Sequence, residues 1–237
     1  VCDAGAHASV IAPPICLLPG FAGGRNQHNK HHCYSVGEHT LHTLLHVEPD
    51  KVLRLTMLLH DVAKPVCITT DEAGQNHFKG HPVKGADMAK VILRRLKFDN
   101  DTTDRVCRLV RYHDDRPELN ARTVRRAMNR IGVENMPALF AVKRADTLGQ
   151  SMYHRQEKLA YVDSFERFFQ EICAAQQCVQ KKDLAISGSD LIAMGMKPGK
   201  EIGAVLNELF ERVLDDPELN QRDKLLDMAH NLMTRLI

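Results

Sequence analysis

Leu58-Leu59-His60-Asp61-Val62-Ala63-Lys64-Pro65 is the most informative stretch of this 237-residue chain. It closes a segment from Lys51 in which apolar residues go nearly all the way round a helix, and such a helix is buried. Pro65 cannot continue the helix, so the pair His60-Asp61 is expected where helix gives way to loop. An unpaired buried carboxylate is very costly. A bound metal ion would compensate it, and a buried hydrogen-bonded pair without metal is the alternative.

The composition favours an all-α protein with a real core. The chain is 43% hydrophobic, has no Trp and few aromatic residues, and shows little strand-like alternation. Its net charge of +2 argues against a strongly electrostatic nucleic-acid binder but leaves room for a local basic patch. No run is long enough to span a membrane, so no membrane partner is expected. The seven cysteines form no compact framework, which is typical of a reduced cytoplasmic protein.

Several segments have clear boundaries. Residues 1–29 are rich in Gly, Ala and Pro and are expected to form an irregular arm. The chain starts without an initiator Met, and the expectation is a trimmed form or a fragment of a longer protein, with a naturally short protein as the alternative. Residues 66–78 predict a β-hairpin, the one clear β signal. Helices are expected at about 34–47, 82–96, 100–112, 120–130 and 153–180, from Pro137 past Asp146, and in a C-terminal part from Ser187, with breaks near 195–199 and 216–217.

Six potential metal ligands are distributed over these helices and their ends: His39, His60, Asp61, His81, His113 and Asp146. A helical bundle can aim all of them at one central cleft. One metal would take His39, His60, Asp61 and Asp146, and a second would take His81 and His113 with Asp61 as the bridge. Mixed imidazole and carboxylate ligands suit Mn, Fe, Co, Ni or Zn, while Mg suits only carboxylate-rich positions. The alternatives are an exposed first-turn histidine at His81 and, at His113, a helix C-terminal histidine favoured by the macrodipole.

Such a pair of ions points to phosphoester chemistry. Two ions about 3.5–4 Å apart can clamp the attacking and leaving oxygens of a phosphoester and generate a hydroxide near neutral pH. Lys64 lies one turn beyond His60 and could reach a phosphate oxygen, or it is an ordinary surface lysine. Arg116, with Arg122 and Arg125, offers either a phosphate-binding edge or a solvated helix face. His32 could line the substrate cleft, with a plain loop histidine as the alternative.

The pattern His39, His60-Asp61, His81, His113, Asp146 resembles the HD superfamily of metal-dependent phosphohydrolases. More specifically, parts of the chain resemble the HD region of bacterial tRNA nucleotidyltransferases: Asn29 to Leu41, Gly80-His81, Leu93 to Asn100 and Val110 to Asp114. Ser187 to Leu191 and Gly195 to Gly203 resemble the C-terminal segment of the same proteins. The likeness covers about Phe21 to the end. The nucleotide-adding head of those enzymes, with its Gly-rich turn and paired carboxylates, has no counterpart in this sequence.

The resemblance implies an HD-domain helical bundle with one small β-hairpin and a helical C-terminal extension. The implied division is an arm at 1–29, an HD domain at 30–183 and the extension at 184–237. The implied function is hydrolysis of phosphodiesters or phosphomonoesters, such as nucleoside 2′,3′-cyclic phosphates. Metal-bound hydroxide would attack phosphorus, with two divalent transition-metal ions as cofactors. Asp61 and Lys64 would be the catalytic residues, and Lys64, His32 and Arg116 would contact the substrate.

Two other functions stay open. The chain could serve mainly to hold RNA, as the body and tail of a tRNA nucleotidyltransferase-like protein with a vestigial metal site. The turn Lys197-Pro198-Gly199-Lys200 at a helix start could then bind an RNA backbone, or it could simply pack the tail on the bundle. The chain could also be a nucleotidase or a guanosine tetraphosphate hydrolase with much the same ligands. The sequence does not predict the physiological substrate, the metal or the oligomeric state.

Overall fold

The computed structural model describes residues 34–234 of the chain. These residues are mostly helical, with one two-stranded hairpin, which confirms the predicted all-α class and the small hairpin. Contacts group them into two units. Unit 1 contains residues 34–116 and Glu134–Ser164, and unit 2 contains Pro117–Val133 and residues 165–234. The division at residues 29/30 and 183/184 stays a prediction.

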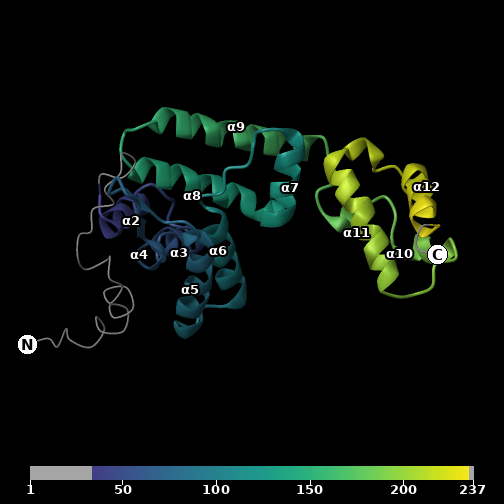
Figure 1. Ribbon diagram of the computed structural model, residues 1–237, viewed down its shortest axis with the longest axis horizontal. Coiled ribbons are helices and arrows are strands. Elements are labelled where there is room, and N and C mark those ends of the chain that lie inside the picture. Colours follow the sequence, from purple (N-terminus) through teal and green to yellow (C-terminus); the bar gives the residue numbers. More distant parts are fainter. Residues whose placement is uncertain (1–33, 235–237) are drawn as a thin grey trace, which may run out of the picture. The chain divides into compact units, whose positions relative to one another are not determined.

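Unit 1 is a bundle of helices (Figure 1), and His60 and Asp61 lie in the short link between α3 and α4. Helix α3 packs against α6 and α8, α2 packs against α3 and α8, and α5 lies along α6. Buried Met57, Val142 and Ala145 form a small core between α3 and α8. Its elements are α2 (Val36–Leu44), α3 (Lys51–Leu59), α4 (Lys64–Cys67), β1 (Thr69–Thr70), β2 (Asn76–His77), α5 (His81–Arg95), α6 (Asn100–Tyr112), α8 (Met136–Gly149) and the start of α9 (Arg155–Ala174).

Side-chain caps fix where the helices of unit 1 begin. Ser35 and Glu38 form a capping box at α2, in which each side chain satisfies the other residue's backbone N–H. Asp50 caps α3 by accepting from the Leu53 amide. Asp99 caps α6 by accepting from the Thr102 amide, and α6 begins at Asn100 as expected. Each cap satisfies an amide that the helix itself leaves unpaired.

The region around Pro65 differs from the prediction in one respect. Helix α3 ends at Leu59 with His60 as its C-cap, so the His-Asp pair does follow a helix end. Pro65, however, is the second residue of the short helix α4, because a proline is compatible with the first turn of a helix. Helix α4 takes up Val66 and Cys67, and the hairpin is shorter than expected. Its strands pair antiparallel with Thr69 opposite His77.

Unit 2 has its own apolar core. Leu191, Leu209, Val213 and Leu225 are fully buried in it. Its elements are α7 (Ala121–Ile131), the rest of α9, α10 (Gly188–Ala193), α11 (Lys200–Asp215), α12 (Arg222–Met233) and the 3-10 turns η2 (Lys181–Asp183) and η3 (Pro217–Leu219); a further turn, η1 (Val133–Asn135), precedes α8. Helix α9 stops well short of the predicted residue 180, and Gln176 just beyond it has a left-handed φ of 48°. In the part of the chain that the structure describes, no helix is both long and apolar enough to cross a membrane.

Candidate metal centre

Four buried histidines converge in unit 1, and three of them come from helix ends. His60 and His113 are the C-caps of α3 and α6, and His81 is the first residue of α5. His39 lies within α2. Each Nδ1 atom bonds a backbone carbonyl: His39 to Gly149 at 3.0 Å, His60 to Met57 at 2.7 Å, His81 to Phe78 at 2.8 Å and His113 to Val110 at 2.7 Å.

These contacts fix the tautomer of each neutral imidazole. A carbonyl oxygen can only accept, so each Nδ1 must carry a hydrogen and donate it. In the neutral ring, the lone pair is then on Nε2. Histidine ligands in metal sites characteristically donate their other ring N–H in this way. All four imidazoles are therefore prepared to bind a cation through Nε2.

The Nε2 atoms lie in two close pairs. Those of His39 and His60 are 3.2 Å apart, and those of His81 and His113 are 3.3 Å apart. Two neutral imidazoles that face each other with lone pairs at this distance repel. A proton or a metal cation between the nitrogens removes the repulsion. Both pairs therefore favour positive charge at the point where they meet.

Asp61 lies between the two histidine pairs and is 2% exposed. Its Oδ2 is 3.3 Å from His60 Nε2, and its Oδ1 is 3.4 Å from His81 Nε2. Among the described residues, no donor makes a well-formed hydrogen bond to the buried Oδ1. Asp146 adds a second carboxylate, with Oδ1 2.9 Å from His39 Nε2. An orphaned buried carboxylate oxygen beside imidazole lone pairs fits a bound divalent cation.

The structure thus brings together all six residues that the sequence singled out as potential ligands. Two groups have ligand atoms within 4.8 Å of one another: His39, His60 and Asp61, and Asp61, His81 and His113. Asp61 belongs to both groups. The residues can hold metal ions, and nothing in their arrangement selects the metal.

The electrostatics favour a positive charge beside His60 and disfavour a proton on His113. Burial alone lowers the pKa of His60, but the carboxylates of Asp61 and Asp146 outweigh it and raise that pKa to about 10. Burial raises the pKa of Asp61, but His60 and Lys64 hold it well below its usual value. Burial, reinforced by repulsion from His60, lowers the pKa of His113 to about 3. A proton on His60 balances the carboxylates, and a divalent cation would take its place.

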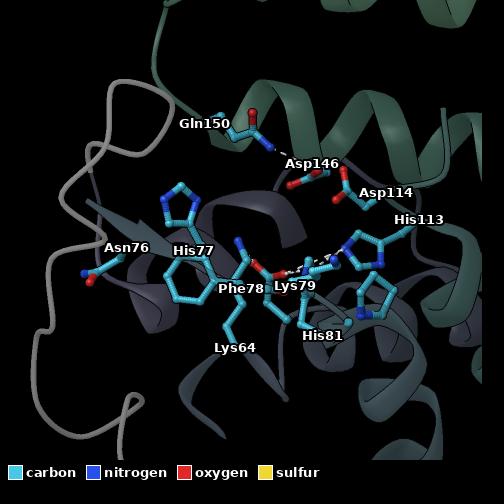
Figure 2. Close-up of a pocket in the computed structure, with 13 residues that line it drawn as sticks. Lys64, Asn76, His77, Phe78, Lys79, His81, His113, Asp114, Asp146 and Gln150 are labelled. Carbon is cyan, nitrogen blue, oxygen red and sulfur yellow. Dashed lines mark hydrogen bonds and ion pairs between the residues drawn. The ribbon is translucent and has the colours of Figure 1, made fainter. Parts of the chain in front are cut away.

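Lys64 is part of the site and is not a surface lysine. It is 5% exposed, and its Nζ lies 2.7 Å from Asp61 Oδ2 and 5.5 Å from the centre of the Phe78 ring. Lys64 and Phe78 line a pocket of about 500 Å³. Its walls also include Asp61, His81, His113 and Asp146. Figure 2 shows Asn76, His77 and Phe78 of the hairpin region on one side of this pocket and His113, Asp114 and Asp146 on the other.

The predicted substrate-contact residues fall in different places. Arg116 is exposed and lines a cavity of about 20 Å³ beside His113 and Asp146, which has room for a water molecule. Arg122 pairs with Asp215, and buried Arg125 donates to the backbone carbonyls of residues 214 and 215. These two arginines are therefore occupied within unit 2. His32 lies outside the described residues.

Two residues behind Asp146 were not predicted from the sequence. Gln150 donates from Nε2 to Asp146 Oδ2 at 3.0 Å, and Lys158 donates from Nζ to Gln150 Oε1 at 2.7 Å (Figure 2 shows the first contact). Gln150 follows Asp146 by four residues, a spacing at which helical side chains meet, so it could have been found. Lys158 is on the next helix, and no sequence pattern links it to the site.

Fold and site together define an all-α protein with a candidate metal centre of four histidines and two aspartates. Comparison with known proteins then gives the family. The family described as "tRNA nucleotidyltransferase domain 2 putative" matches residues 83–229, more than half of the chain. The chain belongs to this tRNA nucleotidyltransferase family.

Individual relatives agree with this assignment. A CC-adding tRNA nucleotidyltransferase from Thermus thermophilus is 30% identical over 213 residues, 85% of this chain and 45% of that enzyme. An A-adding tRNA nucleotidyltransferase from Deinococcus radiodurans is 31% identical over 79% of this chain and 44% of that enzyme. A CCA-adding enzyme from Lacticaseibacillus paracasei is 37% identical over 73 residues, 31% of this chain and 18% of that enzyme. The chain thus spans less than half the length of these enzymes.

Proposed function

We propose that unit 1 is an HD-type metal-dependent phosphohydrolase acting on phosphodiesters or phosphomonoesters. The observation that supports this proposal most strongly is the position of Asp61, whose two oxygens face two separate histidine pairs. In both pairs, every Nδ1 is hydrogen-bonded to a backbone carbonyl. That arrangement supports two divalent transition-metal ions. One would be held by His39, His60, Asp61 and Asp146, and the other by His81 and His113, with Asp61 shared.

Bound ions would supply the nucleophile from water and neutralise the phosphoryl oxygens. The chain's own residues do the rest. Asp61 would be a ligand at both metal positions. Its Oδ2 forms an ion pair with Lys64 Nζ at 2.7 Å. A phosphate entering the pocket reaches the Lys64 ammonium, which stabilises the negative charge that builds up in the transition state. The pocket volume of about 500 Å³ is in the range of sites that bind small ligands, and it suits a nucleotide such as a nucleoside 2′,3′-cyclic phosphate.

Hydrolysis of bis(p-nitrophenyl) phosphate with added Mn²⁺, Co²⁺ or Ni²⁺ tests the proposal. The wild type should release nitrophenolate, and Asp61→Ala should lose this activity because both metal positions lose their shared ligand. Asp87→Ala is the matched control, since Asp87 is an exposed aspartate on α5 away from the pocket. Turnover that survives in Asp61→Ala, or none in the wild type with any of these metals, would reject the hydrolase.

The relatives favour a second candidate function. Taken alone, their names point to a tRNA nucleotidyltransferase-like protein more than to a free phosphohydrolase. In that case the chain contributes RNA contacts, with the metal site vestigial. The turn Lys197-Pro198-Gly199-Lys200 before α11 is the candidate contact. Electrophoretic titration with tRNA at two salt concentrations distinguishes the functions: salt-dependent binding without turnover supports RNA holding, and turnover supports the hydrolase.

A further inference from the structure

Behind Asp146, a buried chain of side chains leads from the metal centre to α9. Asp146 uses its two oxygens differently: Oδ1 is 2.9 Å from His39 Nε2, and Oδ2 accepts a 3.0 Å hydrogen bond from Gln150 Nε2. Gln150 Oε1 in turn accepts from Lys158 Nζ at 2.7 Å. Gln150 and Lys158 are only 8% and 9% exposed, so solvent competes little for these contacts.

From this arrangement we propose that Lys158, acting through Gln150, is a positioning residue for the Asp146 carboxylate. It thereby controls metal affinity at the position formed by His39, His60, Asp61 and Asp146. This inference rests on the proposed metal centre and adds a residue to it. The hydrogen bond of Lys158 goes to Gln150 and not to a histidine or to Asp146, so its contact with the Asp146 carboxylate runs through the Gln150 amide, beside a longer-range charge interaction with Asp146.

The chemistry of the three groups explains why a lysine is needed. A glutamine amide has one donating and one accepting end, whereas an ammonium group only donates. Lys158 therefore holds Oε1 and leaves Nε2 to face Asp146. Without Lys158 the amide could turn over and direct Oε1 at the carboxylate, where two acceptors repel. The ammonium at one end of Gln150 thus fixes the hydrogen bond at the other end.

The two carboxylates of the site are supported in different ways. Lys64 contacts Asp61 directly through a 2.7 Å ion pair. At Asp146 a neutral amide stands between the lysine and the carboxylate. Asp146 therefore keeps its full negative charge for a cation while its orientation is fixed. Arg155 separately anchors the end of α8 by donating to the carbonyl oxygens of Leu148 and Gln150, so loss of Lys158 should leave the backbone in place.

Metal affinity is the direct test. Co²⁺ is titrated into the apoprotein against a chromophoric chelator, and the visible spectrum of bound Co²⁺ is recorded. Lys158→Met and Gln150→Met should each weaken one of the two binding events by about 10–100-fold and change its spectrum, because metal sites lose this much affinity when a supporting contact is removed. The other event, at His81 and His113, should keep its affinity. Lys158→Arg should retain most of the affinity, since arginine also only donates.

Lys90→Met is the matched control, because Lys90 is an exposed lysine on α5. Urea unfolding of each apoprotein shows which variants are folded, and Gln150→Met tests the same contact if Lys158→Met does not fold. Wild-type Co²⁺ affinity in the folded variants would overturn this inference and leave the proposed function intact. Absence of metal binding in the wild type would overturn both.

Discussion

The carbonyl oxygen of Gly149 accepts a 3.0 Å hydrogen bond from Nδ1 of His39. Gly149 is the last residue of α8, and His39 lies within α2, so this contact links two helices at the metal centre. Only a residue without a side chain fits. A Cβ at position 149 would lie 2.5 Å from Cγ2 of Thr43 on α2. The close approach of the two helices therefore sets the direction of the His39 imidazole.

Gly149→Ala should destabilise unit 1 and weaken its metal binding. The added methyl must displace Thr43 or α8, and overpacking of this kind costs roughly 1–3 kcal/mol of unfolding free energy. The displacement also disturbs the His39 hydrogen bond. Urea unfolding gives the first effect and Co²⁺ titration the second.

Two further variants separate this mechanism from a general effect of losing a glycine. Thr43→Ser removes the clashing Cγ2 and should restore most of the stability of Gly149→Ala. Gly203→Ala on α11 meets no neighbouring atom within 4 Å and should be neutral or stabilising by up to about 1 kcal/mol. Wild-type stability in Gly149→Ala would contradict the close approach.

Lys64→Met should lower phosphodiester hydrolysis by about 10²–10³-fold while metal remains bound, because removing one donor to a developing negative charge has an effect of this size. Lys84 is an exposed lysine on α5, and Lys84→Met should hydrolyse the phosphodiester at the wild-type rate. Metal content is measured on the same samples. Equal loss of metal and activity would instead show that Lys64 acts mainly by supporting Asp61.

Phe78→Ala should impair nucleotides more than base-free substrates. The Phe78 ring lines the pocket beside Lys64, and stacking of a base on an aromatic ring contributes about 1–3 kcal/mol. The KM for adenosine 2′,3′-cyclic phosphate should therefore rise about tenfold or more, and that for ribose 2′,3′-cyclic phosphate should change little. Equal changes for both substrates would argue against base stacking at Phe78.

The stability of unit 2 should decrease at low pH, where the Asp190 carboxylate becomes protonated. A hydrogen bond from Arg222 and one from the Ser187 amide lower the pKa of Asp190 from 3.8 to about 2. A carboxyl group with a depressed folded-state pKa stabilises the fold above its unfolded pKa and loses that contribution as pH falls. The stability difference between wild type and Asp190→Asn should be constant above about pH 5 and shrink toward pH 2 in chemical denaturation. A difference that does not change with pH would exclude this role.

The sequence was informative where a local pattern places a residue at a helix end. Pro65 and Pro82 mark the ends near His60 and His81. The six potential ligands do meet: five fall in the two groups that share Asp61, and Asp146 lies beside His39. The hairpin was expected, but its length was not, because Lys64 and Pro65 begin a new helical turn that includes Val66 and Cys67. Helix α9 was predicted too long, since apolar spacing alone does not reveal a left-handed Gln176.

Contacts between helices were beyond the sequence. Lys158 and Gln150 are eight residues apart and meet only because α9 returns beside the end of α8. The requirement for Gly149 likewise comes from Thr43, more than one hundred residues earlier in the chain. Packing between distant segments decides both features, and a single sequence carries no direct record of it.

The most direct test of the two-metal site is the metal content of the purified protein after reconstitution with Mn²⁺ or Co²⁺. We expect about two ions per chain in the wild type. His113→Ala should hold about one, because it removes a ligand from one position only, and Asp61→Ala should lose most of both. A wild-type protein that binds no ion after addition of Mn²⁺, Co²⁺ or Ni²⁺ would contradict the metal centre and leave RNA holding as the function to pursue.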